Sequence, residues 1–213
     1  MIGIIDYGMG NLFSVSKALE RLEVPYKIGD QPSKLENCHG YILPGVGAFP
    51  DAMKALHEHQ FIDFIKRKVD KGVPLYGICL GMQLLFEESE EGGSTAGLGL
   101  FPGKIKRFTG LDHQGTSYKV PHMGWNQLMI HQLDRPILAK VEEEFVYFVH
   151  SYVVQTEESS LLYATADYHM AVPAIVGRDN LVASQFHPEK SGRAGMQLLE
   201  NFCKQMVHSK EHV

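Results

Sequence analysis

The chain has 213 residues, 44% of them hydrophobic and 21% charged, which is ordinary for a globular protein with one substantial core. A net charge of -5 and a pI near 6.1 argue against nucleic-acid binding. No run approaches the roughly 18 apolar residues that span a bilayer, and Met1–Asp6 lacks the basic and apolar regions of a signal peptide. We therefore expect one domain over residues 1–213, working in the cytoplasm without nucleic-acid or membrane contacts.

The three cysteines are Cys38, Cys79 and Cys203, an odd number of widely spaced thiols without a Cys-x-x-Cys pair. This usage favours reduced thiols over a disulfide framework, a zinc site or a redox pair. Cys38 and Cys203 have no motif around them, so we assign both to packing, the usual role of a free cysteine.

The first 90 residues alternate short apolar strands with amphipathic helical stretches. Strands are expected at Ile2–Ile5, Val24–Ile28, Tyr41–Leu43 and Val73–Ile78. Helices are expected at Leu12–Leu22 with Asn11 as its cap, at Asp51–Leu56, at Phe61–Val69 and at Met82–Phe86. Alternation of this kind predicts a parallel sheet with helices on both faces.

The pattern changes between about residues 100 and 186, where the apolar segments become short and turn-bounded. These segments are Lys104–Phe108, Tyr118–Val120, Gln127–Ile130, Phe145–Val149, Leu161–Ala166, Ala174–Val176 and Leu181–Phe186. Residues 177–180 are typical of a hairpin turn, so this half is expected to be antiparallel. A helix follows over Gly192–Val207, and the polar end Lys204–Val213 is expected to fray. The predicted class is α/β, with a mostly parallel central sheet flanked by helices and an antiparallel C-terminal portion.

Residues 77–81, Gly-Ile-Cys-Leu-Gly, have the Gly-x-nucleophile-x-Gly pattern of a nucleophile elbow, with Cys79 as the nucleophile. A tight strand-to-helix turn leaves no room for side chains at its flanks, which explains both glycines. The turn exposes the sulfur at the carboxyl end of the sheet and at a helix N-terminus, where backbone dipoles favour a thiolate. The Leu80 amide is then placed to donate to an oxyanion.

His187-Pro188-Glu189 directly follows the predicted strand Leu181–Phe186. A thiol nucleophile needs a base that takes its proton and returns it to the leaving group, and the base needs an acceptor that orients it. In an extended segment the side chains at positions i and i+2 project to the same side, so Glu189 is able to reach the imidazole. Among eleven histidines, only His187 combines a strand end with such an acceptor.

The turn Pro44-Gly45-Val46-Gly47 also follows a strand and is expected at the same sheet edge. Glycines on both sides of Val46 permit its peptide to flip and donate to an oxyanion. On local sequence alone, a plain turn is the competing interpretation.

The sequence argues against two kinds of site, one for a dinucleotide and one for a metal. Gly8-Met9-Gly10 is similar to the start of a dinucleotide fingerprint, but Phe13 occupies the position of the third glycine. No cluster of His, Cys, Asp or Glu has metal-ligand spacing, so we expect neither a cofactor nor a metal.

Five motifs support a resemblance that covers nearly the whole chain. They are Asp-Tyr-Gly-Met-Gly-Asn at 6–11, Pro-Gly-Val-Gly at 44–47, Gly-Ile-Cys-Leu-Gly-Met-Gln at 77–83, Pro-His-Met-Gly-Trp-Asn at 121–126 and Phe-His-Pro-Glu-Lys-Ser at 186–191. With these residues the chain resembles the class I glutamine amidotransferases. The first and fourth motifs point, within that family, to the glutaminase subunits of imidazole glycerol phosphate synthases.

The resemblance implies a Cys79-His187-Glu189 triad that hydrolyses L-glutamine to L-glutamate and ammonia through a thioester. It implies an oxyanion hole formed by the amides of Val46 and Leu80. The positions that match the family's glutamine-binding residues are Gly45, Gly47, Gln83, Glu91, His150, Ser151 and Tyr152.

The resemblance further implies a heterodimer with a (β/α)8-barrel cyclase subunit. Ammonia would pass to this partner, which makes imidazole glycerol phosphate and AICAR in histidine biosynthesis. Asn11, Trp125 and Asn126 match positions at or near the partner interface, although Trp125 read alone fits an ordinary core aromatic.

Three alternatives remain open from the sequence. A glutaminase subunit of pyridoxal phosphate or anthranilate synthesis would share the triad but not the segment around Trp125. A cysteine hydrolase or peptidase on a similar scaffold would act on esters or peptides. A subunit that kept the fold without activity would not need an intact elbow.

Overall fold

The computed structural model describes residues 1–207 of the chain. Its helices are α1 (Leu12–Arg21), α2 (Pro32–Leu35), α3 (Phe49–Glu58), α4 (Phe61–Asp70), α5 (Leu80–Leu84) and α6 (Gly192–Asn201), with 3-10 turns η1 (Pro136–Leu138), η2 (Ser159–Leu161) and η3 (Pro188–Lys190) and a π-helical turn η4 (Phe202–Val207). Its strands are β1 (Ile2–Ile5), β2 (Tyr26–Gly29), β3 (Gly40–Leu43), β4 (Leu75–Ile78), β5 (Phe86–Ser89), β6 (Thr95–Ala96), β7 (Phe101–Arg107), β8 (His122–Gln127), β9 (Met129–Ile130), β10 (Phe145–His150), β11 (Tyr152–Gln155), β12 (Leu162–Asp167), β13 (Ala171–Arg178) and β14 (Leu181–Ser184).

The central sheet has the strand order β2-β1-β3-β4-β14-β13-β12-β9. The strands from β2 to β14 pair in parallel, whereas β13, β12 and β9 pair antiparallel to their neighbours. The central strands β1, β3, β4 and β14 are buried along their whole length, as both-face burial in a parallel sheet requires. The predicted fold class is therefore confirmed.

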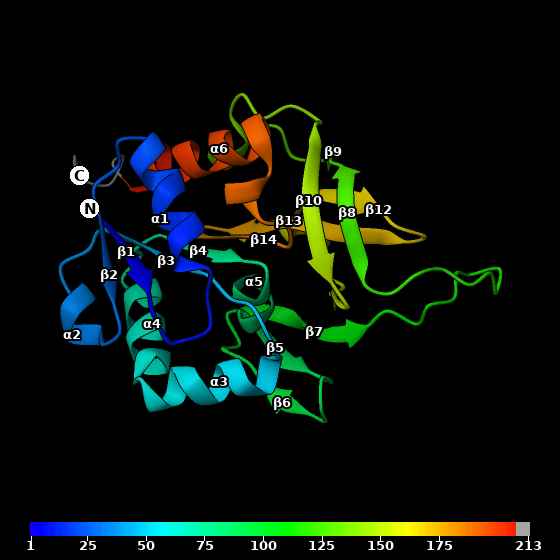
Figure 1. Cartoon of the computed structure of the whole chain (residues 1–213), viewed down its shortest axis with the longest axis horizontal. Helices are drawn as coiled ribbons and strands as arrows, with labels where there is room; N and C mark the ends of the chain where they lie inside the picture. The colour runs from blue at the N-terminus through cyan, green and yellow to red at the C-terminus, as the bar shows by residue number, and fades with distance from the viewer. Residues whose placement is uncertain (208–213) are drawn as a thin grey trace.

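Two hydrophobic clusters cover the two faces of this sheet. On one face α1 and α6 pack with residues of β10 such as Val146 and Phe148. On the other face α3, α4 and α5 pack with residues of β5, β7 and β11 such as Phe86 and Phe101. Figure 1 shows α1 and α6 on one side of the central strands and α3 and α4 on the other.

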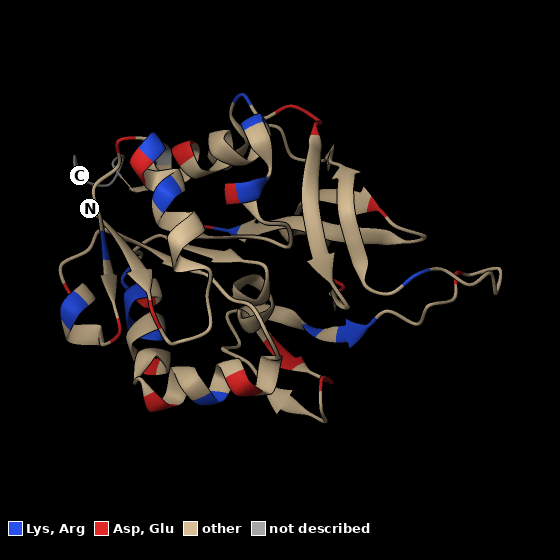
Figure 2. Cartoon of the chain, in the orientation of Figure 1, with Lys and Arg blue, Asp and Glu red and all other residues tan. Residues whose placement is uncertain are grey.

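Two smaller sheets lie beside the antiparallel half of the central sheet. One has the order β11-β7-β5-β6 and the other is the antiparallel pair of β10 and β8. The segment between β7 and β8 extends away from the rest of the chain, with a bridge between Leu111 and Ser117 (Figure 1). In Figure 2 charged residues colour parts of α1–α4, of α6 with the preceding turn η3 and of the sheet of β5 and β7, whereas β8 and β10 contain no Lys, Arg, Asp or Glu.

Most predicted elements agree with the structure, and the differences have local causes. The helix expected from Asp51 begins at Phe49, because Pro50 is accepted in a first helical turn. The helix expected at Met82–Phe86 ends at Leu84, and Phe86 instead opens β5 opposite Phe101.

The strand predicted at Tyr118–Val120 is wrong. Tyr118 is held by ring contacts with Phe108, Tyr168 and His169 rather than by a strand ladder. Strands β5, β6 and β11 were not predicted at all, and β8 was predicted only at its last residue, Gln127. Of the end segment expected to fray, residues 204–207 form part of the π-helical turn, and the remainder lies outside the described residues.

Within residues 1–207, no helix is both long and apolar enough to cross a membrane. All three cysteines are buried free thiols. Over the same residues, no group of three or more His, Cys, Asp or Glu side chains is arranged to hold a metal ion.

Candidate active site

Two neighbouring parallel strands bring the predicted nucleophile and base together. β4 and β14 pair with Ser184 opposite Ile78, so the residues that follow both strands emerge at the same sheet edge. Cys79 directly follows β4, and its amide donates to the Ser184 carbonyl at 2.8 Å. His187 follows β14 by three residues. The juxtaposition of these residues therefore comes from sheet register rather than from local sequence.

The turn at Cys79 has the strained geometry expected of a nucleophile elbow. Cys79 has φ 54° and ψ -110°, a conformation that L-residues rarely adopt and that costs on the order of 1–3 kcal/mol. Both flanking glycines sit where a side chain cannot fit. A Cβ on Gly81 would lie 1.9 Å from the Leu43 carbonyl oxygen, and one on Gly77 would lie 2.8 Å from the Gly81 oxygen.

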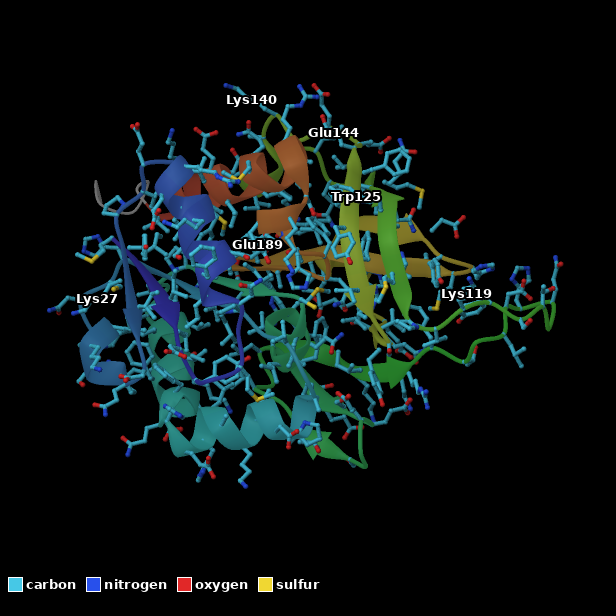
Figure 3. All side chains as sticks on the ribbon, in the orientation of Figure 1. Lys27, Lys119, Trp125, Lys140, Glu144 and Glu189 are labelled. Carbon is cyan, nitrogen blue, oxygen red and sulfur yellow. The ribbon has the colours of Figure 1, made fainter. Side chains whose placement is uncertain are left out.

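His187 is oriented by Glu189, as the sequence predicted. Its Nδ1 lies 2.9 Å from Glu189 Oε1, and the two side chains are 3% and 1% exposed. Burial lowers the pKa of His187, but hydrogen bonding and electrostatic attraction to the Cys79 sulfur and the Glu189 carboxylate outweigh it and raise that pKa to about 9. The imidazole is therefore protonated at neutral pH. Figure 3 shows Glu189 inside the molecule, among the packed elements at the centre of the view.

The Cys79 sulfur has two further polar neighbours. Gln185 Nε2 lies 3.9 Å from it, and the sulfur lies 4.0 Å from the Val149 carbonyl oxygen. Gln185 was not among the residues predicted from the sequence. Its signal was a large amide side chain within the apolar run Leu181–Phe186, where a buried polar group needs a specific partner.

A cavity of about 420 Å³ opens beside the sulfur and is lined by Cys79, Leu80, Val46 and His187. Six predicted substrate-binding residues also line it, namely Gly47, Gln83, Glu91, His150, Ser151 and Tyr152. Gly45 is buried next to this cavity, where Tyr7 Oη and the Gly81 amide would crowd any Cβ at 2.7 and 2.8 Å. The cavity is large enough for an amino-acid-sized ligand.

Gln83 and Glu91 are held by the protein before any ligand arrives. Gln83 Nε2 donates to the Tyr152 carbonyl at 3.1 Å and to Gln185 Oε1 at 2.9 Å. Both amide hydrogens are used, so Gln83 offers a ligand only its Oε1 acceptor. Glu91 Oε2 accepts from the Phe49 amide at 2.8 Å. Two acceptors among the residues that line the cavity suit a ligand that carries an ammonium group.

The two amides predicted to form the oxyanion hole differ in whether they already donate a hydrogen bond. Leu80 opens α5, so its amide is among the N–H groups that a helix leaves unpaired at its start. The Val46 amide instead donates to the Met9 carbonyl at 3.1 Å. In this conformation the Val46 donor is therefore engaged by the loop between β1 and α1.

The three residues predicted at a partner interface lie on two elements. Trp125 is 57% exposed on β8, and Figure 3 shows it on the pair of β8 and β10. Asn126 follows it, but its side-chain amide donates to the Asp167 carbonyl at 2.7 Å. Asn11 accepts from the Ser14 amide at 3.2 Å as the cap of α1. The core interpretation of Trp125 is thus wrong.

Residues 3–206 match the family described as glutamine amidotransferase class-I. The chain is 58% identical over 202 residues to the imidazole glycerol phosphate synthase subunit HisH of Halalkalibacterium halodurans, covering 95% of this chain and 94% of that protein. It is 52% identical over 210 residues to the protein of the same name from Bacillus subtilis, covering 99% of each chain.

Solved structures with much lower identity share the fold. A crystal structure of a glutamine amidotransferase superposes with a TM-score of 0.74 at 19% identity, covering 97% of this chain and 98% of the other. The structure of PurLQS from Thermotoga maritima also gives 0.74, at 16% identity, with coverages of 96% and 98%.

Proposed function

This chain belongs to the class I glutamine amidotransferase family, and we propose that it is the glutaminase subunit of an imidazole glycerol phosphate synthase. The assignment to this pathway rests on one observation, which is that proteins of that name are 52–58% identical to this chain over nearly its full length. The pyridoxal phosphate, anthranilate and peptidase alternatives have no comparable support. The cytoplasmic location and the single domain over residues 1–213 stay predictions.

In the proposed reaction Cys79 attacks the side-chain amide carbon of glutamine as a thiolate, which gives a tetrahedral oxyanion. His187 gives its proton to the departing nitrogen, and ammonia leaves as the thioester forms. His187 then takes a proton from water, which attacks the thioester and releases glutamate and the thiolate. The raised pKa of His187, about 9, suits the acid role at neutral pH.

Glu189 keeps Nδ1 of His187 occupied, so that Nε2 is the nitrogen available for proton transfer. The buried carboxylate also balances the imidazolium charge. We assign Glu91 and the Gln83 Oε1 atom to the α-ammonium group of glutamine, because both are acceptors that line the cavity.

The Val46 amide is proposed to be latent in the isolated subunit. Its bond to the Met9 carbonyl must break before the peptide flips toward the oxyanion. Met9 lies two residues before Asn11, so a partner that contacts the Asn11 loop is able to shift Met9. This arrangement supports a glutaminase that is nearly inactive until the cyclase subunit and its ribonucleotide ligand are present.

The partner is proposed to be a (β/α)8-barrel cyclase that receives the ammonia in a heterodimer. Exposed aromatic and apolar side chains support a docking surface on β8 and α1, where Met123 is 61%, Trp125 57% and Phe13 71% exposed. The uncharged strands β8 and β10 fit a face that is buried on assembly (Figure 2).

The test is glutamate release from glutamine by the chain alone, with a cognate cyclase subunit, and with the cyclase and its ribonucleotide substrate. We expect substantial release only in the third mixture. Full activity of the chain alone would refute the latent Val46 donor, and no activity in any mixture would refute the function.

Cys79→Ala is the matched control, because alanine keeps the Cβ and therefore the strained turn. This variant should release no glutamate and should bind the cyclase with unchanged affinity. Loss of assembly in this variant would mean that Cys79 has more than a chemical role.

A further inference from the structure

Two buried histidines outside the proposed triad lie in direct hydrogen-bonding contact. β8 and β10 place His122 directly opposite His150, and His122 Nδ1 lies 2.9 Å from His150 Nε2. The side chains are 2% and 6% exposed. Burial lowers the pKa of His122 to about 4, and burial with the neighbouring His122 and His187 lowers that of His150 to about 3. Both rings are therefore neutral at physiological pH.

The contacts of these neutral rings fix where each proton sits. His150 Nδ1 lies 2.8 Å from the Tyr152 carbonyl, which only accepts, so Nδ1 carries the proton and Nε2 is the acceptor. His122 must then donate from Nδ1. Its Nε2 accepts from Asn126 Nδ2 at 3.2 Å. The Asn126 orientation is fixed in turn, because its Oδ1 accepts from the Gln127 amide at 2.8 Å.

The chain of hydrogen bonds ends in the glutamine cavity. The Tyr152 carbonyl accepts from both His150 and Gln83, and Gln83 also donates to Gln185, the neighbour of the sulfur. From Asn126 through His122 and His150 to the Tyr152 carbonyl, each side chain donates a hydrogen bond to the next group in the series. Asn126 adjoins the exposed Trp125, so the sequence of bonds connects the proposed docking strand to the ligand-binding acceptors.

We propose that His122 is a positioning residue of the glutamine cavity, which holds His150 in one tautomer and thereby holds the Tyr152 carbonyl and Gln83 in place. This inference rests on the proposed function for its substrate. His122 contacts neither the cavity nor the reacting sulfur, so it acts only through His150. A histidine that merely packed the core would need no proton donor here.

Two substitutions separate hydrogen bonding from packing. His122 stacks on Phe148 and Tyr168 with ring centroids 4.5 and 4.0 Å apart. His122→Phe keeps an aromatic ring there and removes the donor to His150. His122→Asn loses the stacking but carries an amide nitrogen at the position of Nδ1, so it still donates. The proposal and a purely structural role therefore predict opposite rankings.

The assay is steady-state glutamate release by each variant with the cyclase and its ribonucleotide substrate. For His122→Phe we expect KM for glutamine to rise about tenfold with kcat within about threefold, because an unpaired buried acceptor loosens binding without touching the reacting atoms. His122→Asn should stay within about threefold of wild type in both constants. A normal KM in His122→Phe, or an equal defect in both variants, would overturn the proposal.

A suitable control is His131→Phe, which removes an exposed histidine that is bonded to Thr165 at 2.8 Å outside this chain of bonds. It should leave KM and kcat unchanged. Circular dichroism of each variant checks folding.

A second readout does not depend on the substrate. Long-range ¹H–¹⁵N spectra of the histidine-labelled full chain should show both His122 and His150 protonated on Nδ1, and His150 should lose that single tautomer in His122→Phe. A proton on Nε2 of either ring in the wild type would overturn the chain of bonds. If the wild type had no glutaminase activity, the proposed function would be refuted. The NMR spectra would then still decide whether His122 holds His150 in one tautomer.

Discussion

Replacing Gly81 with alanine sets two opposing contributions to the unfolding free energy against each other at the nucleophile turn. Alanine favours helix over glycine by about 1 kcal/mol at most, and Gly81 lies in α5. The new Cβ, however, would lie 1.9 Å from the Leu43 oxygen, and real contacts of this kind essentially never fall below 3.0 Å. The backbone of β3 or α5 must therefore move by more than about 1 Å.

Both elements are fully packed where this shift would occur, since Leu43 and Leu80 are 0% and 4% exposed. Overpacking of a close-packed core typically costs about 1–3 kcal/mol, and here the obstacle is backbone rather than a flexible side chain. We expect Gly81→Ala to lower the unfolding free energy by about 2–3 kcal/mol. Because the same shift moves Cys79, kcat should also fall by at least about tenfold.

Urea titrations followed by far-UV circular dichroism measure this free energy. The one tryptophan, Trp125, is too exposed to report unfolding well by fluorescence. Gly195→Ala is a second test, because its Cβ would lie 2.0 Å from the Pro188 oxygen on the other side of the site. A Gly81→Ala protein as stable as wild type, or more stable, would refute the reasoning.

Three other predictions concern charge and contact. Glu189→Gln should lower the pKa of His187 from about 9, measured by NMR, and should reduce kcat by at least about tenfold; an unchanged pKa would contradict the contribution of Glu189. The folded-state pKa values of His122 and His150, about 4 and about 3, lie below the ordinary 6.5, so the unfolded state takes up protons first as pH falls. The unfolding free energy should thus decline between pH 6.5 and about 4, by at most about 1.4 kcal/mol per pH unit for each histidine, and urea titrations should show a smaller decline in His122→Asn. Trp125→Ala should weaken cyclase binding at least about tenfold by calorimetry, whereas Ile28→Ala, on the opposite edge strand β2, should not; equal effects would argue against docking on β8.

The sequence was informative wherever a local pattern has one structural solution. Two glycines around Cys79 predicted the tight turn, and the crowding at Gly77 and Gly81 explains why no other residue fits. His187 and Glu189 were predicted as a bonded pair because two residues of extended chain suffice to bring them together.

Features that depend on tertiary pairing could not be read from the chain. β5 is polar at Glu87 and Glu88 and is a strand because β7 and β6 lie on either side of it. His122 and His150 meet only through the β8–β10 register. The bond of the Val46 amide to Met9 depends on the orientation of one peptide plane, which flanking glycines leave undetermined.

The pairing of β4 with β14 has a consequence for biosynthesis of the protein itself. The sulfur-bearing turn and the strand that supplies its base come from distant parts of the chain, with Gln185 lying 106 residues after Cys79. During translation, a ribosome-bound chain that ends before residue 181 already contains the whole thiol turn but lacks its neighbouring strand. Such nascent chains cannot consume glutamine, so onset of turnover should require closure of this long-range loop, the slow kind of step in folding.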